Sequence, residues 1–125
     1  MSAQAPSKRS GREAEAYALG YLRQQGLQVL AQNWHCRGGE LDLVMLDSDT
    51  VVFAEVRYRQ HRQWGGALES IDARKRQRLI LAARHFLHAC PQWAEQPCRF
   101  DVIAIEGNDP ARPGLNWVKH AFDSD

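Results

Sequence analysis

Apolar positions along the chain recur at two spacings, which predict where helices and strands lie. Helical spacing runs from Ser10 to a stop at Gly26, and again from an N-cap at Asp72 to about Ala89. Apolar runs typical of strands fill residues 27–34, 40–46, 50–58 and 99–106, and the tail 115–122 is either a short edge strand or a turn. The order α-β-β-β-α-β predicts a small mixed α/β domain.

The second and third predicted strands are joined by a short turn, so we expect an antiparallel hairpin. A four-residue loop over 47–50 sets Leu46 opposite Val51 and Asp42 opposite Glu55, with Cβ atoms of opposed residues about 5 Å apart. Arg57 then lies on the same face as the two acids. A slip of one residue would move Asp42 to the other face, so the prediction depends on this register.

Two carboxylates that meet on a mainly apolar strand pair repel each other and resist desolvation. Either one of them takes up a proton with a raised pKa, or a cation holds both ionised. Oxygen ligands suit Mg²⁺ or Mn²⁺, so Asp42 and Glu55 are candidate metal ligands, and the main-chain carbonyl of Val56 could add a third. The alternative is an ion pair of Arg57 with Glu55 or with Asp42 at a strand end.

The chain of 125 residues predicts one domain over 10–125, preceded by a mobile tail over 1–9. No apolar run approaches the roughly 20 residues that span a membrane, and the start has no apolar signal region. Three scattered cysteines do not suggest a disulfide framework. These features predict a cytoplasmic protein that does not bind membranes.

Charge is distributed unevenly, although the net charge is only +1. Residues 57–84 hold eight basic and two acidic residues, whereas both flanking parts are acidic. This basic centre fits either attraction of phosphate or a solvated helix face. The candidate nucleic-acid-binding residues are Arg59, Arg62, Arg74, Lys75, Arg76 and Arg78.

Four of these cations, from Arg74 to Arg78, open the predicted second helix. Cations at a helix N-terminus oppose the helix dipole, a placement that is easier to explain if they meet phosphate groups. Asp101 interrupts the apolar run 99–106, and we expect it to pair with an arginine of this helix in a structural role.

Five ordered motifs carry a resemblance to a known family, over roughly residues 11–122. They are GREAEAYALGYL, NWHCRGGELDLVMLD, VVFAEVRYR, IDARKRQRLILAARHFL and RFDVIAI. In this order they resemble the YraN-type family of small bacterial proteins, which is similar to archaeal Holliday-junction resolvases and to the restriction-endonuclease-like superfamily. The resemblance implies a central mixed sheet flanked by helices, and a homodimer as a possible assembly.

The superfamily carries a PD-(D/E)xK signature, and the resemblance assigns site residues by it. Asp42 matches the signature aspartate, Glu55 the second acid and Arg57 the lysine position. Glu13 matches the acidic residue on the first helix of the resolvases. From the residues alone, Glu13 also fits a capping box with Ser10, and the two roles are compatible.

Arg57 departs from the signature, because an arginine does not readily deprotonate and is a poor general base. It can instead hold a scissile phosphate with its planar fork. Our first hypothesis is a Mg²⁺-dependent endonuclease that acts on structured nucleic acid, DNA in preference to RNA. The alternatives are a catalytically silent nucleic-acid-binding module of the same fold, and a protein-interaction domain whose charges pair internally.

Overall fold

The computed structural model describes residues 8–59, 71–107 and 114–124, which form two α-helices, five strands and one short 3₁₀ helix. In chain order the elements are α1 (Lys8–Gln24), β1 (Gln28–Cys36), β2 (Gly39–Asp47), β3 (Thr50–Arg59), α2 (Ala73–Ala89), η2 (Pro91–Trp93), β4 (Cys98–Glu106) and β5 (Gly114–Phe122). The predicted order is confirmed, and the tail forms a complete fifth strand. Within the described ranges, neither helix has the length and apolar character needed to cross a membrane.

The five strands form one mixed sheet in the order β1-β2-β3-β4-β5. All neighbours are antiparallel except β3 and β4, which are parallel and are joined through α2. Parallel neighbours need such a crossover, because the chain must return to the same edge before the next strand starts. The result is a mixed α/β domain, as the sequence predicts.

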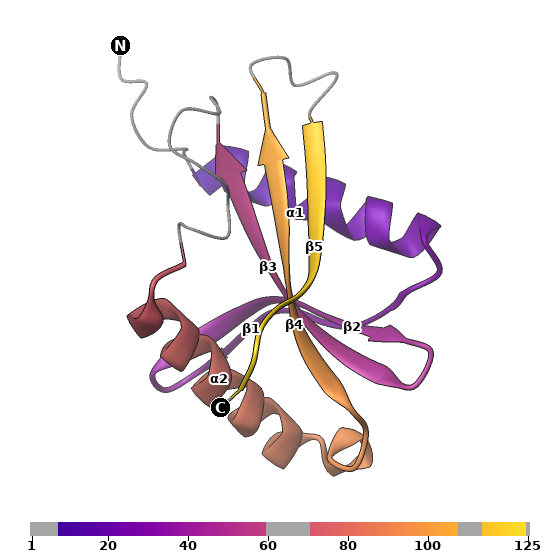
Figure 1. Cartoon of the computed structure of the whole chain (residues 1–125), viewed down its shortest axis with the longest axis vertical. Coiled ribbons are helices and arrows are strands. Elements are labelled where there is room, and N and C mark those ends of the chain that lie inside the picture. The colour runs from indigo at the N-terminus through magenta and orange to yellow at the C-terminus, as the bar shows by residue number, and fades with distance from the viewer. Residues whose placement is uncertain (1–7, 60–70, 108–113, 125) are drawn as a thin grey trace.

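The two helices cover opposite faces of the sheet, as Figure 1 shows. Ala14, Ala18 and Leu22 of α1 pack on one face, with Val52 and Ile103 among the sheet residues of that cluster. Strand residues of the opposite parity face α2, because successive side chains of a strand point to opposite sides. Each face therefore has its own apolar core, and the sheet lies between them.

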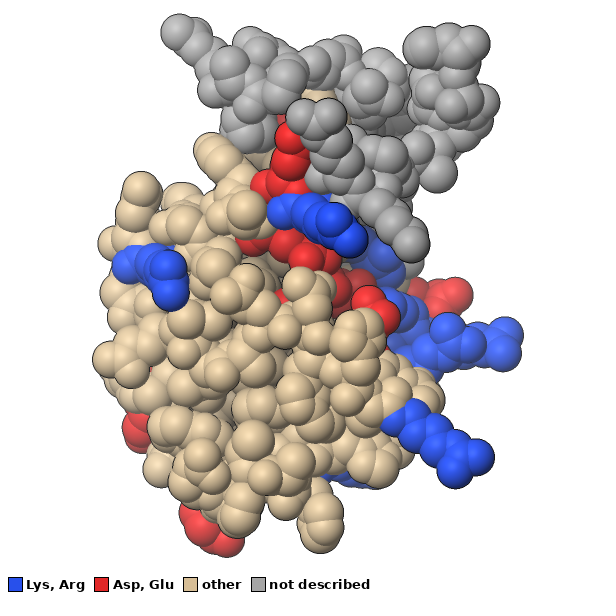
Figure 2. Space-filling model, turned by 180° about the vertical axis from the view of Figure 1, so that it is seen from behind, with Lys and Arg blue, Asp and Glu red and all other residues tan. Residues whose placement is uncertain are grey.

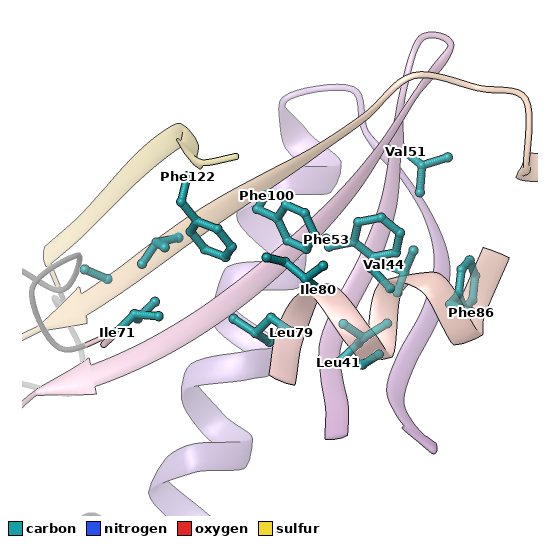
Figure 3. Packing of buried hydrophobic residues seen from close by; sticks show 14 residues of the cluster. Leu41, Val44, Val51, Phe53, Ile71, Leu79, Ile80, Phe86, Phe100 and Phe122 are labelled. Atoms are coloured by element: carbon teal, nitrogen blue, oxygen red, sulfur yellow. The ribbon is translucent and has the colours of Figure 1, made fainter. Parts of the chain in front are cut away.

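Phenylalanine rings pack against one another among the aliphatic side chains of the core beneath α2 (Figure 3). Phe100 stacks on Phe122 at 4.8 Å between ring centroids and on Phe53 at 5.4 Å. Phe86 of α2 meets Phe53 edge-on at 6.0 Å. Such pairs add about 0.5–1.5 kcal/mol each beyond the area they bury, so the rings stabilise the packing of α2 on β3 and of β3, β4 and β5 on one another.

The start of α2 agrees with the prediction. Asp72 is the N-cap, and its side-chain oxygen accepts a hydrogen bond of 2.8 Å from the main-chain N–H of Lys75. The cap satisfies an N–H that has no partner within the helix. It also fixes the orientation of the first turn, which carries Arg74, Lys75 and Arg76.

The start of α1 differs from the prediction. The helix begins at Lys8, so Ser10 lies inside it and is not the N-cap, and the capping box of Ser10 with Glu13 is wrong. Helical spacing alone did not show that the first turn continues upstream of the first apolar residue. The helix ends as predicted before Gly26, whose φ of 96° is available to glycine at little strain.

The β2–β3 hairpin has the predicted register, with Leu46 opposite Val51. Asp47 also pairs with Thr50, so the loop holds two residues instead of the predicted four. Its first residue, Ser48, has a φ of 56°, the left-handed conformation that tight hairpin turns require. Four residues still separate Leu46 from Val51, although two of them pair with each other, so the other facing pairs are as predicted.

The end of β4 is fixed by Asp101, whose side chain is fully buried. Its carboxylate accepts hydrogen bonds from Arg99 Nε, from Trp117 Nε1 and from the main-chain N–H of His120. The structural role is as expected, but the arginine comes from the same strand and not from a helix. These contacts lie where the β4–β5 pairing shifts by a bulge, so they hold the edge strand in register.

Gly39 allows the β1–β2 turn to approach α2 closely. A Cβ atom at Gly39 would lie 2.9 Å from the carbonyl oxygen of Arg78 and 3.3 Å from Cβ of Ala82. We expect Gly39→Ala to lower the free energy of unfolding by roughly 1–3 kcal/mol, because the turn or the helix must shift.

Gly20 provides the matched control, since nothing lies within 4 Å of a Cβ built there. Gly20→Ala should raise the free energy of unfolding by about 0.5–1 kcal/mol through helix propensity. Urea denaturation measures both changes. Equal stabilisation by the two substitutions would contradict the close approach at Gly39.

Candidate functional site

Asp42 lies on β2 at the point where the pairing with β3 ends. Its side chain is 9% exposed, and Oδ2 accepts a hydrogen bond of 2.9 Å from the main-chain N–H of Val56 on β3. The last facing pair is Leu43 with Ala54, and the same register continued by one residue sets Asp42 opposite Glu55. The hairpin therefore brings together the two acids that the sequence pairs.

Glu55 is the most perturbed acid of this cluster. It is 5% exposed, and its pKa is raised from 4.5 to about 8, first by burial and then by the negative charge of Asp42. Positive charge on Lys75 and Arg57 works in the opposite direction, and a hydrogen bond with the Asp42 carboxyl raises the pKa further. Of the two alternatives for such a pair, the raised pKa is therefore found at Glu55, and the cations beside it are side chains of the protein.

Two cations from different elements contact the same carboxylate oxygen. Arg57 Nε lies 3.7 Å and Lys75 Nζ 3.6 Å from Oε2 of Glu55. Arg57 comes from the same strand, two residues on, whereas Lys75 comes from the first turn of α2. The alternative of an ion pair between Arg57 and Glu55 is thus present in the structure, together with the acid pair.

Lys75 is a residue of the candidate site whose position beside Glu55 the sequence did not indicate. We placed it among the residues that bind phosphate, but its ammonium group lies at the acid pair, half-buried between α2 and the sheet. The cap at Asp72 fixes the turn from which Lys75 projects. The Lys75–Glu55 contact depends on how α2 lies across the sheet, which no motif in the sequence specifies.

On α1, the carboxylate of Glu15 interacts electrostatically with Asp42 of the acid pair. Its pKa is raised first by burial and then by the charge of Asp42, while a hydrogen bond with the Asn33 side chain lowers it. Glu13, the residue that we predicted, is exposed on the same helix. Both acids adjoin the buried Ala14, but only Glu15 lies three positions before the buried Ala18, and that helical spacing is the signal that could have distinguished it.

The other predicted nucleic-acid-binding residues separate into groups. Arg74 and Arg78 are exposed on α2, one turn apart. Arg76 faces elsewhere, because its Nε donates to the Ile71 carbonyl at 3.1 Å and its guanidinium lies 5.6 Å from the centre of the Phe122 ring. Arg62 and the side chain of Arg59 lie outside the described residues.

Figure 2 shows one face of the molecule on which acidic side chains lie together with basic side chains beside them, while most of the remaining surface in that view is uncharged. This grouping concentrates charge of both signs in one part of the face. A polyanion would therefore meet cations there next to the acids, and not on a uniformly basic surface.

The donor set at the acid pair fits a small hard cation. Asp42 and Glu55 offer two carboxylates, and Mg²⁺ is commonly held by one or two carboxylates together with water and substrate phosphate. Among the residues that the structure describes, no group of three or more His, Cys, Asp and Glu side chains is arranged to hold a metal ion. The pair thus suits an ion that shares its coordination with a substrate, and not a closed structural site.

Comparison of the sequence with known proteins identifies a family. The profile described as "Uncharacterised protein family UPF0102" matches residues 14–105. The chain belongs to the UPF0102 family. The matched stretch contains Glu15, Asp42, Glu55 and Lys75, so the whole acid cluster and its α2 cation lie within the UPF0102 region, whereas Glu13 lies just before it.

Relatives in several Pseudomonas species share nearly the whole length. A UPF0102 protein of Pseudomonas fluorescens is 64% identical over 121 residues, covering 97% of this chain and 98% of the relative. Another, of Pseudomonas syringae pv. syringae, is 61% identical over 117 residues, covering 94% and 95%. A third, of Pseudomonas aeruginosa, is 58% identical over 125 residues, covering 99% and 100%.

Proposed function

We propose that this UPF0102 protein is a metal-dependent endonuclease of the restriction-endonuclease-like superfamily that hydrolyses phosphodiester bonds in structured nucleic acid, DNA in preference to RNA. The observation that carries the proposal is the Asp42–Glu55 pair at the buried end of a hairpin, with Lys75 and Arg57 at the same carboxylate oxygen. Perturbed acids beside cations are typical of catalytic sites.

Asp42 and Glu55 are the residues that would hold Mg²⁺ or Mn²⁺. Burial and mutual repulsion disfavour two ionised carboxylates here, and a divalent cation removes that penalty. When bound, such an ion supplies Lewis-acid chemistry at the phosphate and lowers the pKa of water. The hydrogen bond from the Val56 N–H keeps the Asp42 carboxylate oriented toward Glu55.

The superfamily signature has one lysine beside its acids, whereas here two cations, Arg57 and Lys75, lie at the same carboxylate oxygen. Arg57 stays charged and offers a planar fork, so it suits the non-bridging oxygens of a phosphate. Lys75 Nζ lies 3.6 Å from Oε2 of Glu55, so its N–H groups can donate to that carboxylate or to a phosphate oxygen beside it. A lysine side chain thus reaches the acid pair from α2, although the strand carries arginine.

Removal of divalent cations is the direct test. Labelled four-way junctions, flaps and single strands are incubated with the protein and Mg²⁺, and again with EDTA. We expect cleavage of at least one substrate with Mg²⁺ and its loss with EDTA. Asp42→Asn should lose the Mg²⁺-dependent rate, whereas Asp49→Asn, an exposed position in the hairpin turn, should keep it.

A second candidate function is a silent nucleic-acid-binding module of the same fold. The observation that favours it is that Glu55 already contacts cations from two elements, so its charge is partly compensated without a metal ion. This candidate requires salt-sensitive binding of the same substrates by wild type, with no cleavage at any Mg²⁺ or Mn²⁺ concentration. Cleavage that depends on Asp42 would exclude it.

A further inference from the structure

A groove of about 650 Å³ opens between the β1–β2 turn and the first half of α2. We name it the hairpin groove and define it by its lining residues His35, Cys36, Gly38, Gly39, Glu40, Lys75, Arg78 and Leu79. Lys75 lines the groove and also contacts Glu55, so the groove and the acid pair share a side chain. A molecule in the hairpin groove would therefore contact a side chain that also contacts one of the candidate metal ligands.

The two walls of the hairpin groove are held at contact distance. Gly39 lies so close to the Arg78 carbonyl oxygen that a methyl group on its Cα atom would not fit between the turn and the helix. Gly38 has a φ of 94°, which fixes the sharp turn at the neighbouring position. A groove of this size lies in the range of small-ligand pockets, so it suits one nucleotide and not the width of a duplex.

The charged side chains that line the hairpin groove would orient a bound nucleotide. Lys75 and Arg78 provide two cations on the α2 wall, where a phosphate would be bound. On the β1–β2 wall, Nδ1 of His35 lies 3.5 Å from Oε1 of Glu40, and both side chains are more than half exposed. The Glu40 carboxylate repels phosphate but accepts hydrogen bonds from base amino groups, and the His35 ring offers a face for stacking.

We propose that the hairpin groove binds one unpaired nucleotide of the substrate, with its phosphate on Lys75 and Arg78 and its base against His35 and Glu40. This inference rests on the proposed function and narrows its substrate class to nucleic acids with an unpaired nucleotide next to the cleaved bond. Fully paired duplexes are then poor ligands, because both strands cannot enter the hairpin groove together.

The test measures binding of nucleic acid in the absence of divalent cations. Binding is monitored by NMR on protein labelled with ¹⁵N-glycine. An oligo(dC) strand of about eight nucleotides is the probe, and a blunt duplex of the same length is the comparison. The amide signals of Gly38 and Gly39 should shift with the single strand, while those of Gly20 and Gly26 on the α1 side of the molecule should not. The duplex should leave all four signals in place.

Arg78→Ala should weaken single-strand binding roughly tenfold, because a charge-assisted phosphate contact is lost. Arg84→Ala removes an equally exposed arginine from the same helix but outside the hairpin groove, and it should bind like wild type. The proposal is overturned if the single strand saturates the protein without moving Gly38 and Gly39. It is also overturned if the duplex moves them equally, or if the two arginine variants bind alike.

The binding result separates this inference from the proposed function. Shifts at Gly38 and Gly39 without any cleavage in Mg²⁺ would support nucleotide binding in the hairpin groove and contradict the proposed nuclease activity. Metal-dependent cleavage without those shifts would support the proposed nuclease activity and contradict nucleotide binding in the hairpin groove.

Discussion

Replacing Glu55 with glutamine is expected to lower the rate of Mg²⁺-dependent cleavage by roughly 10³-fold. Glutamine keeps the shape of the side chain but lacks the negative charge that a hard cation requires. The fold should persist, because Glu55→Gln removes a buried charge next to Asp42 and does not create a cavity. Initial cleavage rates on the best substrate of the panel, at saturating Mg²⁺, measure the effect.

Glu95→Gln is the matched control for this substitution. Glu95 is exposed and follows the short helix η2, so the same chemical change there should leave the cleavage rate at the wild-type value. Equal rates for wild type and Glu55→Gln would exclude Glu55 as a ligand, and any remaining nuclease activity would then come from another part of the chain or from a contaminant.

The second large effect concerns the pH dependence of stability. The pKa of Glu55 is about 8 in the folded protein and has its ordinary value of 4.5 when the side chain is solvated. Between these values the folded state binds more protons than the unfolded state, so stability falls as pH rises from about 4.5 to about 8. Wild type should lose on the order of a few kcal/mol relative to Glu55→Gln across this range.

Urea denaturation of both proteins at pH 5.5 and pH 8.5 measures this difference, and the contribution of the other titrating groups largely cancels in the comparison. Mg²⁺ added at pH 8.5 should restore part of the loss in wild type only, because binding to the folded state stabilises it by mass action. A difference between the two proteins that stays constant with pH would show that Glu55 titrates at its ordinary pKa.

The sequence predicts the acid pair because a hairpin is a local structure. Leu46 and Val51 are separated only by turn residues, and once they face each other the alternation of strands decides where Asp42 and Glu55 point. The error in loop length, two residues instead of four, did not change the register. The N-cap at Asp72 is predictable for the same reason, since it depends on four consecutive residues.

Positions that depend on packing between distant elements are not predictable in this way. Lys75 reaches Glu55 because α2 lies across β2 and β3, and a choice between Glu13 and Glu15 depends on how α1 is rotated on the sheet. Asp101 accepts hydrogen bonds from Trp117 and from the main-chain N–H of His120 across a bulge in the β4–β5 pairing, which leaves no pattern in the sequence, whereas Arg99 is its neighbour on the same strand.

The hairpin also has a consequence for the order of assembly. Its two strands meet through a two-residue turn, whereas the parallel pairing of Val51 with Cys98 must close the chain around the whole of α2. Contacts that are near in sequence form faster than contacts that are distant, so the hairpin precedes the crossover. We therefore expect Asp42 and Glu55 to come together before Lys75 reaches them, so that Arg57 of the same hairpin is the first of the two cations to offset their repulsion.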